Sequence, residues 1–304
     1  MQVSIIIVNW NTRELLADCI QSIYASPPEG KYDIWVVDNF SSDGSSAMIR
    51  ENYPSIKLIE NDKNLGFARA NNQALRRSQG EYVLLLNPDT VVKSNAISKL
   101  IHFLDNNPDA GIAGPRLINP DGTLQISAFP FPTLFREFWR MFHLDSVYCL
   151  SNYPMNNWNQ DQARDVDTLL GACMLIRRDA INQSGLFDEK YFIYSEEVDL
   201  CIRLNRSGWR LYWVPRAVVV HHGGKSTQQV SEEMFLRLYE GKVLLFRKHH
   251  SKLSVFVYKL ILFAATLTRL VLTPIALVEE PAKRDEHLSL SNSYRRLFWL
   301  LPDL

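Results

Sequence analysis

A short apolar segment in the first third of the chain ends at a carboxylate. Tyr82–Leu86 is followed directly by Asn87, Pro88 and Asp89. Pro88 cannot continue a strand ladder, and ligands of open α/β sheets bind beyond the carboxyl ends of the strands. Asp89 is therefore a candidate to bind a metal ion or another ligand. Asn, Pro and Asp are also common turn residues, so a plain turn is the alternative.

The same tripeptide recurs at Asn119, Pro120 and Asp121, where Gly122 follows it. This second copy lies between two short apolar segments, and we interpret it as a hairpin turn and nothing more. The tripeptide alone therefore does not identify a site, and the rest of the chain must separate the two copies.

Three acids, Glu196, Glu197 and Asp199, lie at the start of a predicted helix over residues 195–206. Ser195 is a natural N-cap, and the helix dipole favours acids in the first turn. Three acids within four positions exceed what capping requires. A carboxylate at a helix start is expected to stay ionised, and a general base must be ionised to accept a proton from a hydroxyl group. Helix stabilisation and catalysis are both open for each acid.

Further polar residues are predicted at strand ends. His221 and His222 follow a predicted strand, and an imidazole there is either structural or a ligand of a cation held by Asp89. Polar segments also follow the first three strands and should gather at one sheet edge, where they could bind a nucleobase and a ribose. The helix that starts near Gly66 could receive a phosphate. The three polar segments are residues 9–13, 38–44 and 61–67. For each of them, turn and cap formation is the alternative.

The elements that must position these residues alternate between strand-like and helix-like patterns. This alternation predicts an α/β fold with a mostly parallel sheet. Residues 129–161 are predicted to form loops and short helices that cover the sheet edge. We expect one domain over residues 1–228 and a C-terminal helical extension over residues 229–304. The predicted strands are residues 3–8, 34–37, 56–59, 82–86, 167–170, 173–176 and 217–220, and the predicted helices are residues 12–24, 45–51, 67–78 and 195–206.

Composition excludes several functional classes. Lys and Arg together number 33, and so do Asp and Glu, so the formal net charge is zero. This charge gives no indication of a nucleic-acid partner. The four cysteines are scattered without a Cys-x-x-Cys pair, which indicates a reduced, cytoplasmic protein. The chain leads straight into a strand, so we expect no signal peptide. No Gly-x-Gly-x-x-Gly occurs, and Val219 stands where a phosphate-binding P-loop before Lys225 would need glycine.

The segment over residues 253–278 is strongly apolar, and basic residues flank it. Its longest charge-free stretch before Arg269 is shorter than the ~18 to 20 residues of a spanning helix. We predict a helical segment that lies at the surface of an anionic membrane. A helix packed on the catalytic domain or in a dimer interface is the alternative. The polar positions recur every seventh residue at Lys252, Lys259, Thr266 and Thr273, and the basic neighbours are Arg247, Lys248, Lys283, Arg284, Arg295 and Arg296.

In combination, these residues resemble the inverting, nucleotide-sugar-dependent glycosyltransferases of family 2, which have the GT-A fold. The resemblance covers roughly residues 1–225, and within the family it is to bacterial rhamnosyltransferases that build cell-surface polysaccharides. The motifs that carry it are SIIIVNWN at 4–11, VVDN at 36–39, NLGFARANN at 64–72, LLNPDT at 85–90, GACM at 171–174, EEVDL at 196–200 and VHH at 220–222.

The resemblance implies a binding site for the sugar nucleotide and a metal ion. Asp38 would bind the base, with Asn9 and Asn11 beside it. Asp89 corresponds to the last Asp of the family's Asp-x-Asp motif and would bind Mg²⁺ or Mn²⁺ at the donor diphosphate, with His221 at the same end. Asn87 replaces the first Asp of that motif, which implies fewer protein ligands for the metal. The remaining donor-binding residues would be Asn39, Asn64, Gly66 and Asn71.

The resemblance also implies the reaction. Glu197 aligns with the catalytic base, and Glu196 is the alternative. Gly171, Ala172 and Asp188 would border the acceptor. We expect rhamnose to pass from dTDP-rhamnose to a saccharide or lipid-linked saccharide at the inner face of the cell membrane, with inversion of configuration.

Two rival functions and one structural question accompany this expectation. The first rival is a non-catalytic sugar-nucleotide sensor or assembly subunit, and its only support is Asn87 in place of an acid. Nucleotidyl transfer would need a basic, glycine-rich triphosphate loop, which residues 9–13 do not provide. Formation of a homo-oligomer is open.

Overall fold

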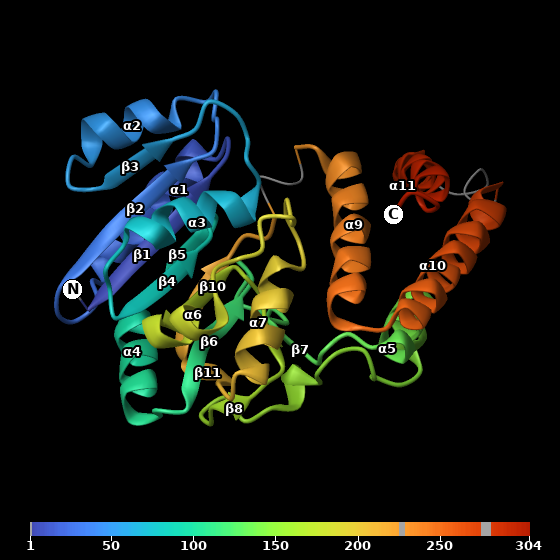
Figure 1. Ribbon diagram of the computed structural model, residues 1–304. Helices are drawn as coiled ribbons and strands as arrows, with labels where there is room; N and C mark the ends of the chain where they lie inside the picture. Colours follow the sequence, from blue (N-terminus) through green and yellow to red (C-terminus); the bar gives the residue numbers. More distant parts are fainter. Residues whose placement is uncertain (1, 225–228, 275–280) are drawn as a thin grey trace. The chain divides into compact units, whose positions relative to one another are not determined.

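The computed structural model describes residues 2–224, 229–274 and 281–304, and it describes side chains in all of these except 281–287. The chain forms two compact units (Figure 1). The first contains Met1–Phe131, Tyr153–Phe192 and Glu196–Gln229, and the second contains Pro132–Asn152, Ile193–Ser195 and Val230–Leu304. The division into domains at residue 228 stays a prediction, and the structure adds two earlier segments to the C-terminal unit.

A central sheet forms the first unit, and its strand order is β3-β2-β1-β4-β10-β6-β11-β5, with β8 paired to β11. The first four strands in this order are mutually parallel, whereas β10 runs antiparallel to both of its neighbours. The predicted α/β fold with a mostly parallel sheet is confirmed. The strands are β1 Val3–Asn9, β2 Tyr32–Asp38, β3 Lys57–Glu60, β4 Tyr82–Leu86, β5 Thr90–Val92, β6 Ala110–Ile118, β8 Arg164–Asp165, β10 Cys173–Arg177 and β11 Arg210–His221.

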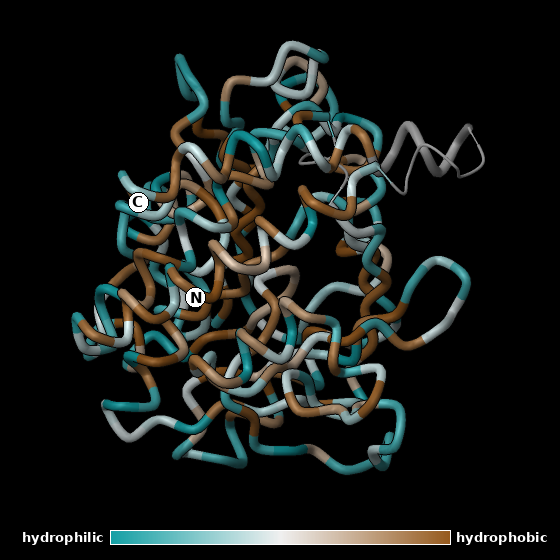
Figure 2. Tube along the Cα trace, turned by 90° about the vertical axis from the view of Figure 1, so that its right-hand side faces the viewer, coloured by the Kyte–Doolittle hydropathy of each residue, from teal (hydrophilic) through white to brown (hydrophobic). Residues whose placement is uncertain are grey.

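Helices cover both faces of this sheet. All seven residues of β1 are buried, as expected of a strand covered on both sides. Ile5 and Ile7 belong to one apolar cluster with residues of α1, α2 and α4, and Ile6 and Val8 belong to another with residues of α3, α6 and α7. In Figure 2, hydrophilic residues gather in the peripheral loops of the trace. The helices are α1 Arg13–Ala25, α2 Ser45–Asn52, α3 Phe67–Arg77, α4 Ala96–Asn106, α6 Arg178–Ser184 and α7 Glu196–Arg206.

The register of the strands places the predicted site residues in one row. Asn9 pairs with Asp38 at the carboxyl ends of β1 and β2, and Leu86 at the end of β4 pairs with Cys173 of β10. The short strand β5 returns to pair with the end of β11, where Thr90 lies opposite His221. A separate two-stranded sheet contains β7 Ala128–Phe129 and β9 Thr168–Leu169.

The second unit is helical. Its core includes Met141, Phe246, Tyr258, Leu262 and Leu297. Residues 132–152, which the sequence assigned to the sheet edge, contribute Met141 to this core. The helices are α5 Leu134–Met141, α9 Ser231–His249, α10 Lys252–Leu272 and α11 Pro281–Leu300, and the 3₁₀ turn η1 Leu144–Ser146 follows α5, whereas η2 Met155–Asn157 belongs to the first unit.

A buried ion pair joins two helices of the second unit. Glu137 of α5 is 1 % exposed, and its carboxylate lies 2.7 Å from Nζ of Lys242 in α9 and 2.9 Å from Nη1 of Arg140. Burial alone would raise the pKa of Glu137, but the two cations outweigh it and lower that pKa. The carboxylate is therefore ionised and fixes α5 against α9.

Candidate active site

The ends of β1 and β2 form a connected polar cluster. Nδ2 of Asn9 donates to Oδ2 of Asp38 at 3.2 Å and to Oγ of Ser41 at 3.1 Å. The other carboxylate oxygen of Asp38 accepts a hydrogen bond from the backbone N–H of Ser41 at 2.8 Å. Asn11 accepts from the backbone N–H of Ser42 through Oδ1 at 2.7 Å. Asn9, Asn11 and Asp38 thus lie together as predicted, and the sequence did not identify Ser41 as their common partner.

The amide side chains after β2 and β3 shape the loop that precedes α3. Asn39 donates to Oδ1 of Asn64 at 2.8 Å and accepts from the backbone N–H of Leu65 at 2.9 Å. Gly66 has φ +81°, and a Cβ there would lie 2.4 Å from the carbonyl oxygen of Phe192. Only glycine fits this position, because the carbonyl group of Phe192 occupies the place that a side chain would take.

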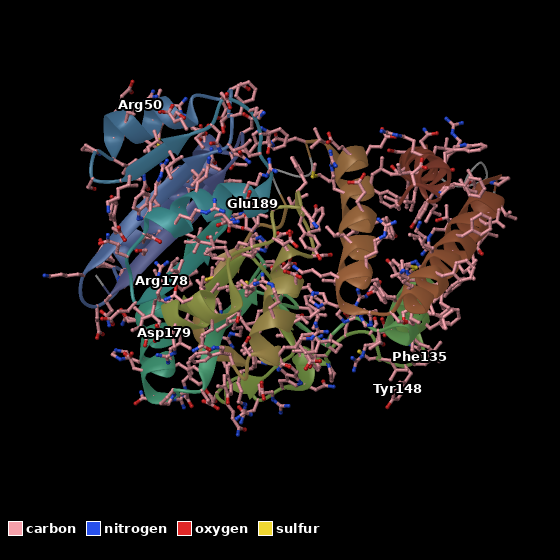
Figure 3. All side chains as sticks on the ribbon, in the orientation of Figure 1. Arg50, Phe135, Tyr148, Arg178, Asp179 and Glu189 are labelled. Atoms are coloured by element: carbon pink, nitrogen blue, oxygen red, sulfur yellow. The ribbon has the colours of Figure 1, made fainter. Side chains whose placement is uncertain are left out.

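Of the two asparagines in α3, one bonds within the helix and the other crosses to the loop after α6. Asn71 donates to the carbonyl oxygen of Phe67 at 2.9 Å, and its donor-binding role stays a prediction. Asn72 exchanges hydrogen bonds with the backbone of Phe187 and donates to Oε1 of Glu189 at 3.0 Å. Arg76 also donates to Glu189, which is labelled in Figure 3. The sequence did not identify Asn72, although it is the more connected residue.

Asp89 faces His221 at the end of the sheet. Asp89 is 4 % exposed, and its Oδ1 lies 3.4 Å from Nε2 of His221. The backbone N–H of His222 donates to the carbonyl oxygen of Asp89 at 2.9 Å, which holds the two segments together. Asn87 is fixed nearby, because its backbone N–H donates to the carbonyl oxygen of Ala172 at 2.9 Å. The structure therefore brings Asp89, His221, Asn87 and Ala172 together.

Gln125 orients the imidazole of His221. Its Oε1 lies 2.7 Å from Nδ1 of His221, and its Nε2 donates to Oδ1 of Asn119 at 3.0 Å. Since Nε2 of Gln125 is a donor, Oε1 must accept the proton of Nδ1. In the neutral imidazole, Nε2 then carries the lone pair and directs it toward Asp89.

This arrangement fits a divalent cation. A histidine that binds metal commonly donates its other N–H to a carbonyl group, as His221 does to Gln125. Asp89 and His221 supply one carboxylate and one imidazole, and no group of three or more His, Cys, Asp or Glu within the described ranges could hold a metal ion. Such a pair suits a cation that shares its remaining positions with substrate phosphates and water.

Gln125 is the main residue that the sequence interpretation missed. It follows the Asn119 to Gly122 turn, which was interpreted as a hairpin and nothing more. A lone amide between the apolar residues Leu124 and Ile126 was the available signal. The second tripeptide is thus connected to the first, because Asn119 bonds to Gln125, Gln125 bonds to His221, and His221 faces Asp89.

The three acids of α7 have three different environments. Asp199 is buried and its Oδ2 lies 2.8 Å from Nε of Arg203, which also donates to the carbonyl oxygens of Gly185 and Leu186. Glu196 is buried, and its Oε2 has no hydrogen-bond partner among the described residues. Glu197 is half-buried, and its Cβ lies 3.6 Å from where a Cβ of Gly171 would be.

Burial, together with the neighbouring Glu197, raises the pKa of Glu196 well above its ordinary value. The expectation that an acid at this helix start stays ionised is therefore wrong for Glu196, because desolvation outweighs the helix dipole. The helix begins at Glu196, directly after two left-handed residues, Tyr194 with φ 68° and Ser195 with φ 70°.

The predicted acceptor residues are distributed along the same side of the sheet. Gly171 adjoins Glu197, and Ala172 is bonded to Asn87. Asp188 accepts a hydrogen bond from the backbone N–H of Lys190 at 3.1 Å, so it closes the turn that Asn72 anchors. The acceptor roles of all three residues stay predictions.

Comparison with known proteins places this site in context. The sequence model of Glycosyl transferase family 2 matches residues 4–185. An N-acetylglucosaminyl-diphospho-decaprenol L-rhamnosyltransferase of Mycobacterium tuberculosis is 32 % identical over an alignment of 226 residues. The alignment covers 66 % of this chain and 69 % of that protein. The rhamnosyltransferase WbbL of Escherichia coli is 27 % identical over 242 residues, 77 % of this chain and 88 % of that protein.

Among solved structures, the mannosyltransferase PcManGT from Pyrobaculum calidifontis, in complex with GDP-Man and Mn²⁺, is similar in fold. The TM-score is 0.59 and the sequence identity is 18 %, with 99 % of this chain and 84 % of that chain covered. The likeness extends the fold assignment over nearly the whole chain.

Replacing Glu196 by Gln should change how stability depends on pH. Above its ordinary pKa of 4.5, Glu196 ionises in the unfolded chain but stays protonated in the folded one, so the native protein loses stability as pH rises. Glu196→Gln is neutral in both states and should be relatively more stable at pH 8 than at pH 5. Urea unfolding at the two pH values measures this difference. The exposed Glu51→Gln is the control, and an unchanged pH dependence in Glu196→Gln would contradict the assignment.

Replacing Gln125 by Leu should weaken metal binding. The change removes the acceptor for Nδ1 of His221, and outer-shell changes of this kind typically cost about 10- to 100-fold in metal affinity. Mn²⁺ titration by electron paramagnetic resonance, with dTDP present, measures the affinity, and ¹⁵N NMR reports the His221 tautomer. Gln125→Glu keeps an acceptor and should retain most of the affinity. Wild-type affinity and an unchanged tautomer in Gln125→Leu would refute this role.

Proposed function

The chain belongs to glycosyl transferase family 2, and from this membership we propose that it transfers rhamnose from dTDP-rhamnose to a saccharide acceptor with inversion. The similarity to two rhamnosyltransferases supports rhamnose as the transferred sugar. The name of the mycobacterial relative includes a diphospho-decaprenol group, which supports a lipid-linked saccharide as the acceptor. Such an acceptor suits a cytoplasmic enzyme at the inner face of the membrane.

The donor would bind along the carboxyl ends of β1 to β4. Asp38 and Asn9 would contact the base, with Asn11 and Ser41 fixing their loop. The close approach of the Phe192 carbonyl group to Gly66 would fix the loop that borders the nucleotide beside α3. Asp89 and His221 would hold Mg²⁺ or Mn²⁺, which when bound would offset the charge that grows on the leaving diphosphate. Asn87 contributes no acid, so this binding would rest chiefly on Asp89.

Glu197 would accept the proton of the acceptor hydroxyl. The oxygen of that hydroxyl forms a bond to the anomeric carbon, and the bond from this carbon to the diphosphate oxygen breaks on the opposite side. The observation that carries this assignment is the difference among the three acids of α7. Asp199 is committed to Arg203, Glu196 favours its protonated form, and Glu197 is half-buried beside Gly171. Glu197 is the least buried of the three acids and adjoins Gly171 at the predicted acceptor, and its Oε2 is itself buried.

Replacing Glu197 by Gln should abolish most turnover and leave donor binding intact. Loss of a general base lowers the rate by roughly 10²- to 10⁴-fold, whereas the side chains proposed to contact the donor are unchanged. Turnover is measured as nucleoside diphosphate released from dTDP-rhamnose in the presence of acceptor and Mn²⁺, and donor affinity by calorimetry. Near-normal transfer in Glu197→Gln would overturn the assignment of the base.

Replacing Asp89 by Asn should have the complementary effect. Donor affinity and Mn²⁺ dependence should fall together, because the carboxylate that faces His221 at the proposed metal position is lost. Asp179→Asn, at an exposed position in α6, is the matched control and should behave like the wild type. Equal donor affinity in Asp89→Asn with and without Mn²⁺ would contradict the proposed metal site.

A panel of nucleotide sugars tests the function as a whole. Release of nucleoside diphosphate with dTDP-rhamnose, exceeding that with UDP- and GDP-linked sugars, is the expected result. Release from another donor alone would overturn the rhamnosyl specificity. Binding of a sugar nucleotide without release, across several acceptors, would identify the non-catalytic sensor instead.

A further inference from the structure

Helix α10 exposes an apolar stripe along its whole length. The stripe contains Leu253, Phe256, Leu260, Phe263, Leu267, Val271 and Leu272, and each of these side chains is between 41 % and 71 % exposed. The spacing of three and four residues from Leu253 to Val271 places these residues on one face of the helix, and Leu272 follows at its end. The helix is also long and apolar enough to cross a membrane, with 21 residues and a mean hydropathy of 1.9.

Several polar residues of α10, unlike the exposed Lys252 and Thr268, contact the unit itself. Nζ of Lys259 donates to the carbonyl oxygen of Pro302 at 3.3 Å, and Thr266 is fully buried. Oγ1 of Thr273, directly after the helix, lies 2.9 Å from Oγ of Ser291 in α11. Arg269 donates to the carbonyl oxygens of Ala265 and Met141. The helix is thus apolar on its outward face as well as on the face that packs on its own unit, unlike a helix on a water-exposed surface.

Exposed basic residues lie at the amino end of this stripe and on helix α11. Arg247 and Lys248 end α9, Lys252 starts α10, and Arg295 is exposed on α11. Trp299 of α11 is 73 % exposed, and its neighbour Phe298 packs on Phe263 of the stripe with ring centroids 5.3 Å apart. Apolar residues beside basic groups and an exposed tryptophan are characteristic of proteins that bind membrane interfaces. Lys283 and Arg284 lie outside the described side chains.

We infer that the apolar stripe of α10 inserts into an anionic lipid surface with the helix lying in the plane of the membrane. The deep contacts of Tyr258, Leu262 and Ala265 hold one face of the helix on its own unit, which a spanning helix would have to leave. A second copy of the chain is disfavoured as the occupant. Helix α10 contains no acidic residue that could pair with the exposed Arg247, Lys248 and Lys252 of a second copy, whereas an anionic lipid surface complements them.

This inference deepens the proposed membrane location, and it can be tested without sugar transfer. Co-sedimentation with phosphatidylcholine vesicles that contain phosphatidylglycerol measures partition of the full chain in the absence of donor. We expect binding to these vesicles, weaker binding to pure phosphatidylcholine, and a loss of at least about tenfold in Phe256→Ser/Leu260→Ser. Circular dichroism establishes that the variant keeps its helices.

The matched control replaces two exposed apolar residues outside the stripe, Val147 and Tyr148, by Ser. Tyr148 projects from the loop after α5 and is labelled in Figure 3. This control should bind vesicles like the wild type. Equal loss in both double variants, or no vesicle binding by the wild type, would overturn the inference. A dimer in lipid-free buffer that Phe256→Ser/Leu260→Ser dissociates would assign the stripe to a second copy instead. Release of nucleoside diphosphate by a chain that fails to bind vesicles would separate the two proposals.

Discussion

The hydrogen bond from the backbone of His222 to the carbonyl oxygen of Asp89 is the interaction on which the candidate site depends. Asp89 follows β4 in the middle of the sheet order, whereas His221 ends β11 near its edge. The pairing of β5 with β11 closes this separation and sets Asp89 Oδ1 opposite His221 Nε2. Without that pairing, the chain would hold a carboxylate and an imidazole at strand ends with no reason to face each other.

The fold was predictable because the relevant signals are local. Apolar segments and helical periods fixed the position of most elements of the first unit, and helix α3 begins at Phe67 as the pattern indicates. The assignment of residues 132–152 to the C-terminal unit was not predictable. It depends on pairs such as Glu137 with Lys242, which are 105 positions apart and follow no periodic pattern.

The proximity of several candidate residues was predictable from the sequence, and the burial and protonation of each residue were less so. Asn9, Asp38 and Asp89 were found because strand ends of a parallel sheet share an edge. Glu196 and Glu197 are adjacent in a first helical turn, and the sequence treats them alike. Burial separates them, since Glu196 is 4 % exposed whereas Glu197 is less buried and lies beside Gly171. Gln125 was missed because its importance comes from His221, a residue 96 positions away.

The two Asn-Pro-Asp turns show how an exposed loop can control a buried group. Asp121 is fully exposed and Gly122 has φ +86° with nothing within 4 Å of its Cβ position, so this turn has few packing constraints. Its shape nevertheless reaches the imidazole of His221 through Asn119 and Gln125. A substitution in this surface hairpin can therefore change which ring nitrogen of the buried His221 carries the proton, while every residue that faces the substrate stays the same.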